Sequence, residues 1–266
     1  MDPHVDLFDS TYRHFSDQAL AAVRRETYGE DIGQNSWTTA DEYDRFYAWL
    51  GLARGEHLLE IASGSGGPAL YLARRYACRV TGIDVNEHAV AAANQAALHS
   101  HTVGAYFQIA DAAQRLPFEA ETFAGLLCID SANHFRDRLA VLREWERVLQ
   151  PGRRLVFTDP VVLTGPVSNA ELAARSSIGF FLFVPPAVTE QYIQAAGLRL
   201  LQCEDVSENA AQVSGRWRAA RQARRDELVA LEGEDRFAGL QRFLAVVHQL
   251  TSERRLSRFA YLAEKV

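Results

Sequence analysis

The sequence predicts a doubly wound α/β protein, in which helices cover both faces of a mostly parallel sheet. Short apolar runs alternate with helical patterns along the chain, and a glycine-rich loop joins the first run to a helix. An acidic residue, Asp84, closes the second run 20 residues after the first loop glycine, Gly64. Strands that alternate with helices form βαβ units, which assemble into parallel sheets.

The elements follow in a regular order. The first fifty residues combine short helical patterns with a polar, glycine-containing stretch at 29–36. Residues 208–250 are helical in pattern and too long for a simple connection, so we expect an inserted helical cap there. Strands are predicted at 57–62, 78–85, 105–110, 122–129, 154–159, 198–206 and 256–263, and helices at 68–75, 87–98 and 138–149.

Composition limits the class of protein. The 266 residues are 48% hydrophobic and 23% charged, which excludes wholesale disorder. The net charge is −6, and no dense basic cluster favours a nucleic-acid partner. No run of 18 apolar residues predicts a membrane span, and residues 1–6 do not resemble a signal peptide. The three cysteines are widely spaced, which favours a reducing, cytoplasmic compartment, and we expect a monomer or homodimer.

The glycine loop is the strongest local motif. Gly64, Gly66 and Ala69 match G-x-G-x-x-G/A, which lets a ligand approach the backbone at a helix N-terminus. Alone, the pattern also fits a dinucleotide enzyme or a tight turn without a ligand. Glu60 argues against a dinucleotide, because its carboxylate would repel a pyrophosphate. The same carboxylate would suit a ligand that carries positive charge and no phosphate. S-adenosylmethionine, with its sulfonium and ammonium groups, is such a ligand.

Four segments in order resemble motifs of class I S-adenosylmethionine-dependent methyltransferases of the small-molecule, type 11-like group: 58–68, 80–86, 108–118 and 144–152. The similarity covers about residues 55–160. Ala62 departs from the usual first glycine of the loop, and Arg153 departs from the second glycine of the turn before strand five. The resemblance implies a Rossmann-like seven-stranded sheet that is mostly parallel, with an antiparallel last strand.

The same resemblance assigns cofactor roles to individual residues. It implies that Glu60 and the loop glycines shape the methionine pocket, that Asp84 binds the ribose and that Asp111 binds the adenine amino group. Asp111 has an alternative interpretation as a turn or helix-capping aspartate. The cofactor-binding residues expected in this way are Glu60, Ala62, Gly64, Gly66, Asp84, Val85, Asp111, Ala112 and Cys128.

The segment after the fourth strand is expected to carry the chemistry. His134 is the preferred base or acceptor ligand, with a structural role as its equal alternative, and Asp130 and Asn133 are weaker candidates. Because the sulfonium activates the methyl group, a protein base is not obligatory. The segment lacks the Asn/Asp-Pro-Pro-Tyr signature of nucleic-acid amino methyltransferases, which favours a small-molecule acceptor.

Four further residues are candidates for the acceptor pocket: Tyr12, Gln34, Trp37 and Phe181. Tyr12 and Trp37 fit ordinary helix packing equally well, and Phe181 belongs to an aromatic run that is typical of a core. No metal site is expected, because His99 and His101 lack a supporting carboxylate.

We therefore predict one methyltransferase domain over residues 1–266. It would comprise a helical lid at 1–51, a cofactor-binding core at 52–160, and an acceptor-side half at 161–266 that contains the insert at about 208–250. The predicted activity is methyl transfer from S-adenosylmethionine to the nitrogen or oxygen of a small metabolite. The alternatives are a catalytically silent S-adenosylmethionine-binding subunit and, less favoured, a nicotinamide-dependent oxidoreductase.

Overall fold

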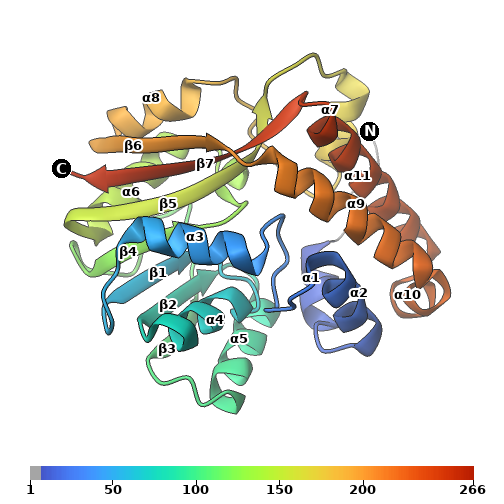
Figure 1. Ribbon diagram of the computed structural model, residues 1–266, viewed down its shortest axis with the longest axis horizontal. Helices are drawn as coiled ribbons and strands as arrows, with labels where there is room; N and C mark the ends of the chain where they lie inside the picture. Colours follow the sequence, from blue (N-terminus) through green and yellow to red (C-terminus); the bar gives the residue numbers. More distant parts are fainter. Residues whose placement is uncertain (1–6) are drawn as a thin grey trace.

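The computed structural model describes residues 7–266, in which one seven-stranded sheet has the order β3-β2-β1-β4-β5-β7-β6 (Figure 1). The first five strands pair in parallel, and β7 runs antiparallel between β5 and β6. The predicted mixed sheet is thus confirmed. The strands are β1 (His57–Ile61), β2 (Arg79–Asp84), β3 (Ala105–Ile109), β4 (Phe123–Cys128), β5 (Leu149–Leu163), β6 (Leu198–Asp205) and β7 (Leu256–Lys265).

Helices cover both faces of this sheet and one of its edges. A short 3-10 helix, η1 (Ala132–His134), follows β4. The α-helices are α1 (Phe8–Arg13), α2 (Gln18–Tyr28), α3 (Ala40–Leu50), α4 (Gly67–Tyr76), α5 (Glu87–His99), α6 (Arg138–Val148), α7 (Asn169–Arg175), α8 (Val188–Ala195), α9 (Ser207–Ala223), α10 (Arg225–Glu232) and α11 (Glu234–Ser252).

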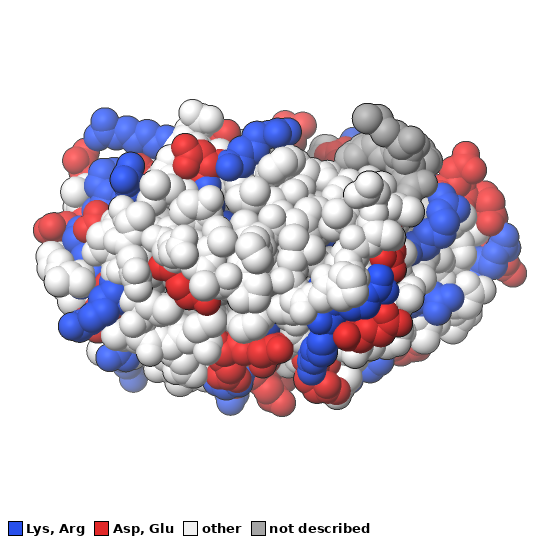
Figure 2. All heavy atoms as spheres, turned by 90° about the horizontal axis from the view of Figure 1, so that it is seen from above, with Lys and Arg blue, Asp and Glu red and all other residues white. Residues whose placement is uncertain are grey.

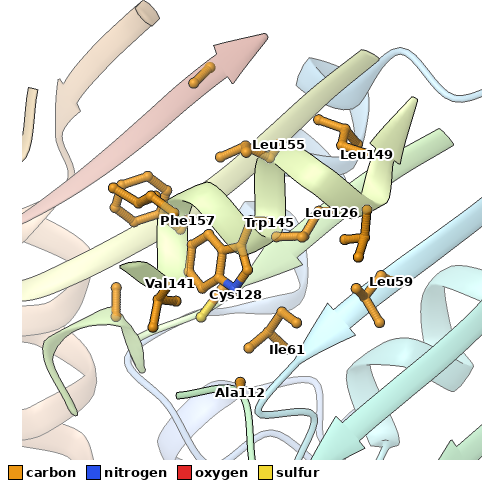
Figure 3. Close-up of a cluster of buried hydrophobic side chains, with 14 of the residues drawn as sticks. Leu59, Ile61, Ala112, Leu126, Cys128, Val141, Trp145, Leu149, Leu155 and Phe157 are labelled. Carbon is orange, nitrogen blue, oxygen red and sulfur yellow. The ribbon is translucent and has the colours of Figure 1, made fainter. Parts of the chain in front are cut away.

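Alternation along the strands divides the core into two layers. In β1, Leu58 packs with α3, α4 and α5 on one face, whereas Leu59 and Ile61 pack with α6 and α8 on the other. Successive side chains of a strand point to opposite faces, and both faces of a parallel sheet are covered. Trp145 of α6 lies at the centre of the second layer, and Figure 3 shows Cys128 beside it. The strands are therefore held rigidly on both sides.

The carboxyl ends of the parallel strands face a separate group of helices. Figure 1 shows α1, α2 and α9–α11 beyond this end of the sheet, where β6 runs into α9. They share apolar clusters to which Leu20, Val213 and Phe243 contribute. Residues 40–50, which the sequence analysis placed in the lid, instead form α3 and pack on the sheet face through Tyr43 and Phe46.

Three elements differ from the sequence-based expectation. Strand β5 begins at Leu149 and includes the predicted turn, because Gly152, with φ of +71°, continues the chain without ending the strand. Helices α7 and α8 were not anticipated, since each has fewer than nine residues and no long periodic pattern. Across the described residues, no helix is both long and apolar enough to span a bilayer. On the face in Figure 2, acidic and basic side chains are mixed around a largely uncharged centre.

Candidate functional site

A cavity of about 370 Å³ lies at the carboxyl ends of β1, β2 and β4, beneath α1. In open α/β sheets this edge is where ligands bind. Four kinds of segment line it: the glycine loop after β1, the turns after β2, β3 and β4, the N-terminal residues that close over them, and the irregular segment after α7. Its lining includes Phe8, Tyr12, Asn35, Glu60, Ala62, Ser63, Gly64, Asp84, Val85, Asp111, Ala112, Ile129, Asp130, His134 and Ile178.

The glycine loop is in close contact with its surroundings. A Cβ atom on Gly66 would lie 2.7 Å from both Ala93 and Phe107, and one on Gly64 would lie 2.5 Å from the Tyr12 hydroxyl. Both glycines have left-handed backbone angles, with φ of +72° and +53°. Ala62 also has a left-handed backbone, with φ of +54°, where its methyl group is unfavourable. Alanine at this position therefore keeps the left-handed conformation that glycine would adopt, and the backbone of Ala62 is strained as a result.

Asp84 links the second strand to the glycine loop. Its Oδ2 atom accepts a hydrogen bond from the Gly64 amide at 2.8 Å, and its Oδ1 atom accepts one from the Asn86 amide at 2.9 Å. Burial raises the pKa of this carboxyl group, while the backbone amides oppose that rise. Since each carboxylate oxygen has two lone pairs, Asp84 still has acceptor capacity toward the cavity.

Glu60 is a buried carboxyl group without a compensating cation among the described residues. Its Oε2 atom has no hydrogen-bond partner there, and the nearby Asn35 Nδ2 and Ser63 Oγ atoms share this condition. Burial, together with the negative charge of Asp84, raises the pKa of Glu60 to about 8. Unpartnered buried polar atoms are rare in folded proteins, and three of them around one cavity indicate a polar ligand.

His134 ends η1 and lines the same cavity. Its Nδ1 atom lies 2.9 Å from the carbonyl oxygen of Phe180, so Nδ1 carries the hydrogen and Nε2 keeps its lone pair. The imidazole packs edge-on against Phe8 and tilted against Phe181. Burial, reinforced by the charge of Arg175, lowers the pKa of His134 to about 4. The side chain is therefore neutral near pH 7 and can accept a hydrogen bond through Nε2.

Asp130 holds the lid to the sheet rather than serving as a free base. Its carboxylate accepts hydrogen bonds from the Trp37 amide at 2.8 Å, the Thr158 hydroxyl at 2.7 Å and Nε of Arg258 at 2.7 Å. Arg258 also pairs with Glu42 of α3 at 2.9 Å. This network joins the segment before α3 to the end of β4, to β5 and to β7. Both carboxylate oxygens of Asp130 already accept hydrogen bonds within it.

Apart from the weaker candidates Asp130 and Asn133, nine of the predicted site residues line the cavity, and five do not. Gly66 packs behind the loop, and Cys128 is fully buried in the sheet core. The Gln34 amide is used locally, since it bonds the Ile32 amide and the Glu30 carbonyl. Trp37 and Phe181 line a smaller neighbouring pocket. The nine are Tyr12, Glu60, Ala62, Gly64, Asp84, Val85, Asp111, Ala112 and His134.

Sequence reasoning missed several cavity residues. Asn35 lies in the polar stretch that drew attention to Gln34, but only the fold shows which of the two amides faces the cavity. Ile178 comes from the irregular segment after α7, which has no periodic pattern to mark it. Ser63 was within reach, since it belongs to the glycine loop itself. In the part of the chain that the structure describes, no cluster of metal-ligating side chains occurs.

Comparisons with known proteins establish the family. Residues 59–157 match the family described as "Methyltransferase domain". The chain is 30% identical over 203 residues to 27-O-demethylrifamycin SV methyltransferase of Amycolatopsis mediterranei, covering 71% of this chain and 74% of that protein. It is 33% identical over 213 residues to O-methyltransferase cnsE of Penicillium expansum, covering 77% and 75%. The chain therefore belongs to the S-adenosylmethionine-dependent methyltransferases that act on small molecules.

Structural comparison supports the fold over the whole chain. Mycolic acid cyclopropane synthase CmaA1, complexed with SAH and CTAB, superposes with a TM-score of 0.82. The two are 16% identical, with coverage of 100% of this chain and 99% of that one. The cofactor is S-adenosylmethionine, and the unpartnered carboxylate oxygen of Glu60 fits its ammonium group.

Proposed function

We propose that this protein is an O-methyltransferase that uses His134 to take the proton from an acceptor hydroxyl. The observation that carries the proposal is the free Nε2 of a neutral histidine in the cavity that Glu60 and Asp84 also line. The names of the two relatives above support oxygen as the methylated atom.

The proposed division of roles follows from the polar groups of the cavity. Glu60 would bind the ammonium group of the cofactor, Asp84 the ribose hydroxyls and Asp111 the adenine. When bound, S-adenosylmethionine supplies an electrophilic methyl group. The sulfur atom of the cofactor would keep the electrons of its bond to that methyl group. His134 would orient the hydroxyl through Nε2 and receive its proton as the new carbon–oxygen bond forms. Phe8 and the Tyr12 ring of α1 would exclude water from this region.

Screening small-molecule pools with S-adenosylmethionine labelled in its methyl group tests the proposal. We expect label in ether products, and replacement of His134 by alanine should lower turnover about 10²–10⁴-fold with nearly unchanged cofactor affinity. Because the pKa of His134 is near 4, its contribution should stay constant from pH 6 to pH 8. Normal turnover of the variant would exclude a base role for His134. Tight cofactor binding without transfer to any hydroxyl compound would favour the silent subunit.

We also propose a reducing compartment as the site of action. Cys78, Cys128 and Cys203 are all free thiols in the structure, and two of them are buried. Proteins of oxidising compartments more often pair their cysteines.

A further inference from the structure

Arg175 is a buried cation within an aromatic box. It is the last residue of α7 and is 2% exposed. Its guanidinium carbon lies 4.5 Å from the centre of the Phe181 ring, 5.1 Å from that of Phe243 and 6.0 Å from that of Trp37. A capping box at Ser168 and the ion pair of Glu171 with Arg255, at 2.6 Å, fix the start of α7. The position of Arg175 is therefore set by the fold.

Arg175 has no hydrogen-bond or ion-pair partner within residues 7–266, and its buried Nη1 atom is unsatisfied. The two carboxylates whose charges act on Arg175 are each paired with another arginine. Asp130 pairs with Arg258 at 2.7 Å, and Asp159 pairs with Arg138 at 2.6 Å. Burial lowers the pKa of Arg175 to about 9, so the group stays charged at neutral pH. A buried charge without a partner is costly and is seldom retained for stability alone.

The space beside Arg175 opens toward the proposed reaction site. A pocket of about 40 Å³ is lined by Arg175, Trp37, Phe181 and Phe243, and it shares Phe8 and His134 with the main cavity. In this measure one water molecule needs about 10–15 Å³. The pocket therefore has room for a compact polar group such as a carboxylate. Arg175 and His134 both contact the Phe181 ring.

We propose that Arg175 binds an anionic oxygen group of the methyl acceptor, so that the enzyme selects hydroxyl compounds bearing a carboxylate or an ionised acidic hydroxyl. The planar guanidinium suits either group, because it can donate two parallel hydrogen bonds to a carboxylate or a single charged hydrogen bond to an ionised hydroxyl. The placement of the acceptor beside His134 rests on the proposed function. The anion site itself rests only on the missing counter-ion and the adjoining pocket.

The proposal also accounts for the weak basicity of His134. A histidine whose pKa is near 4 removes a proton poorly from an ordinary alcohol. A hydroxyl that is already acidic requires less help from the protein. The acceptor would therefore supply the counter-ion that Arg175 lacks within residues 7–266.

Binding of three small probes to the full chain saturated with S-adenosylhomocysteine tests the site without turnover. Benzoate carries a carboxylate, 4-nitrophenolate an ionised hydroxyl, and benzamide is the uncharged match. By calorimetry, we expect at least one anion to bind about tenfold or more tightly than benzamide, as charged hydrogen bonds allow. The tighter anion then shows which source of charge the site prefers. Equal affinity for all three probes, or no measurable binding of any, would overturn the proposal.

Two variants and a control assign the preference to Arg175. Arg175→Met should abolish the preference for the anion, and Arg175→Lys should keep part of it. Arg216→Met removes an arginine that is exposed on α9 and lies outside the pocket, so it should leave the preference unchanged.

Thermal unfolding separates a binding role from a packing role. Because Arg175→Met removes an uncompensated buried charge, its melting temperature should be equal to or above that of the unsubstituted protein. A lower melting temperature with an unchanged anion preference would make Arg175 a packing residue and overturn the proposal. These results are independent of methyl transfer. Failure to methylate any hydroxyl compound would refute the proposed function alone, and the absence of an anion preference in the unsubstituted protein would refute this inference alone.

Discussion

At the residue scale, Ala62 shows how one side chain strains the glycine loop beside the main cavity. Its φ of +54° lies in the left-handed region, which glycine adopts freely and alanine does not. We predict that Ala62→Gly raises the free energy of unfolding by about 1 kcal/mol, an estimate from the alanine cost in this region. Urea denaturation measures the change. The greater flexibility of glycine in the unfolded chain opposes the gain, so a less stable variant would mean that the strain is negligible.

Glu60 should give the protein a specific dependence of stability on pH. Its pKa is about 8 in the folded protein, against 4.5 for the free side chain. Between these values the folded state holds a proton that the unfolded state has lost, so the stability contribution is complete below pH 4.5 and disappears by pH 8. Compared with Glu60→Gln, the cofactor-free protein should lose up to about 1.4 kcal/mol of relative stability per pH unit in this window.

Urea denaturation of both proteins at several pH values from 5 to 8.5 checks this prediction. The difference between the two pH profiles isolates Glu60, because all other titrating groups are common to the two proteins. Parallel pH profiles would show that Glu60 ionises normally.

At the scale of elements, the sequence predicted those parts of the fold that have strong local signals. Strand β1, the glycine loop and α4 follow from an apolar run, two glycines and Pro68 in the first helical turn. Helix α3 was predicted as a helix, but its packing on the sheet face was not. The amphipathic pattern of a helix does not indicate which other element its apolar face contacts. Helix α7 is short and lacks a periodic pattern, so Arg175 at its end could not be placed in advance.

The site shows the same division between local and tertiary information. Asp84 and Glu60 stand beside recognisable strand ends and reach the cavity as expected. Cys128 follows the same logic of strand ends, yet its side chain points into the layer around Trp145 (Figure 3). Trp37 comes together with Arg175 and Phe181 only through packing between elements that are distant in the sequence. Such contacts depend on the tertiary fold and not on local pattern.

At the scale of the whole molecule, one edge of the sheet gathers the cofactor cavity, the proposed base and the proposed anion site. The parallel strands deliver Glu60 and Asp84, and the helices beyond their carboxyl ends provide the cover (Figure 1). Arg258 of β7, through Asp130 and Glu42, ties the segment before α3 and α3 itself to the sheet. With these proposed roles, the donor and the acceptor would lie in adjoining spaces, and holding the two together is the main requirement of methyl transfer.

Calorimetric titration with S-adenosylhomocysteine, comparing the unsubstituted protein with Asp84→Ala, tests the central claim most directly. The claim is that the cofactor occupies the cavity between the glycine loop and α1, with Asp84 on its ribose. Loss of charged hydrogen bonds worth about 1.5–3 kcal/mol each predicts an affinity at least about tenfold lower. Glu87→Ala, which removes an exposed acid outside the cavity, should bind like the unsubstituted protein. Equal affinities of the Asp84→Ala and unsubstituted proteins would contradict the account.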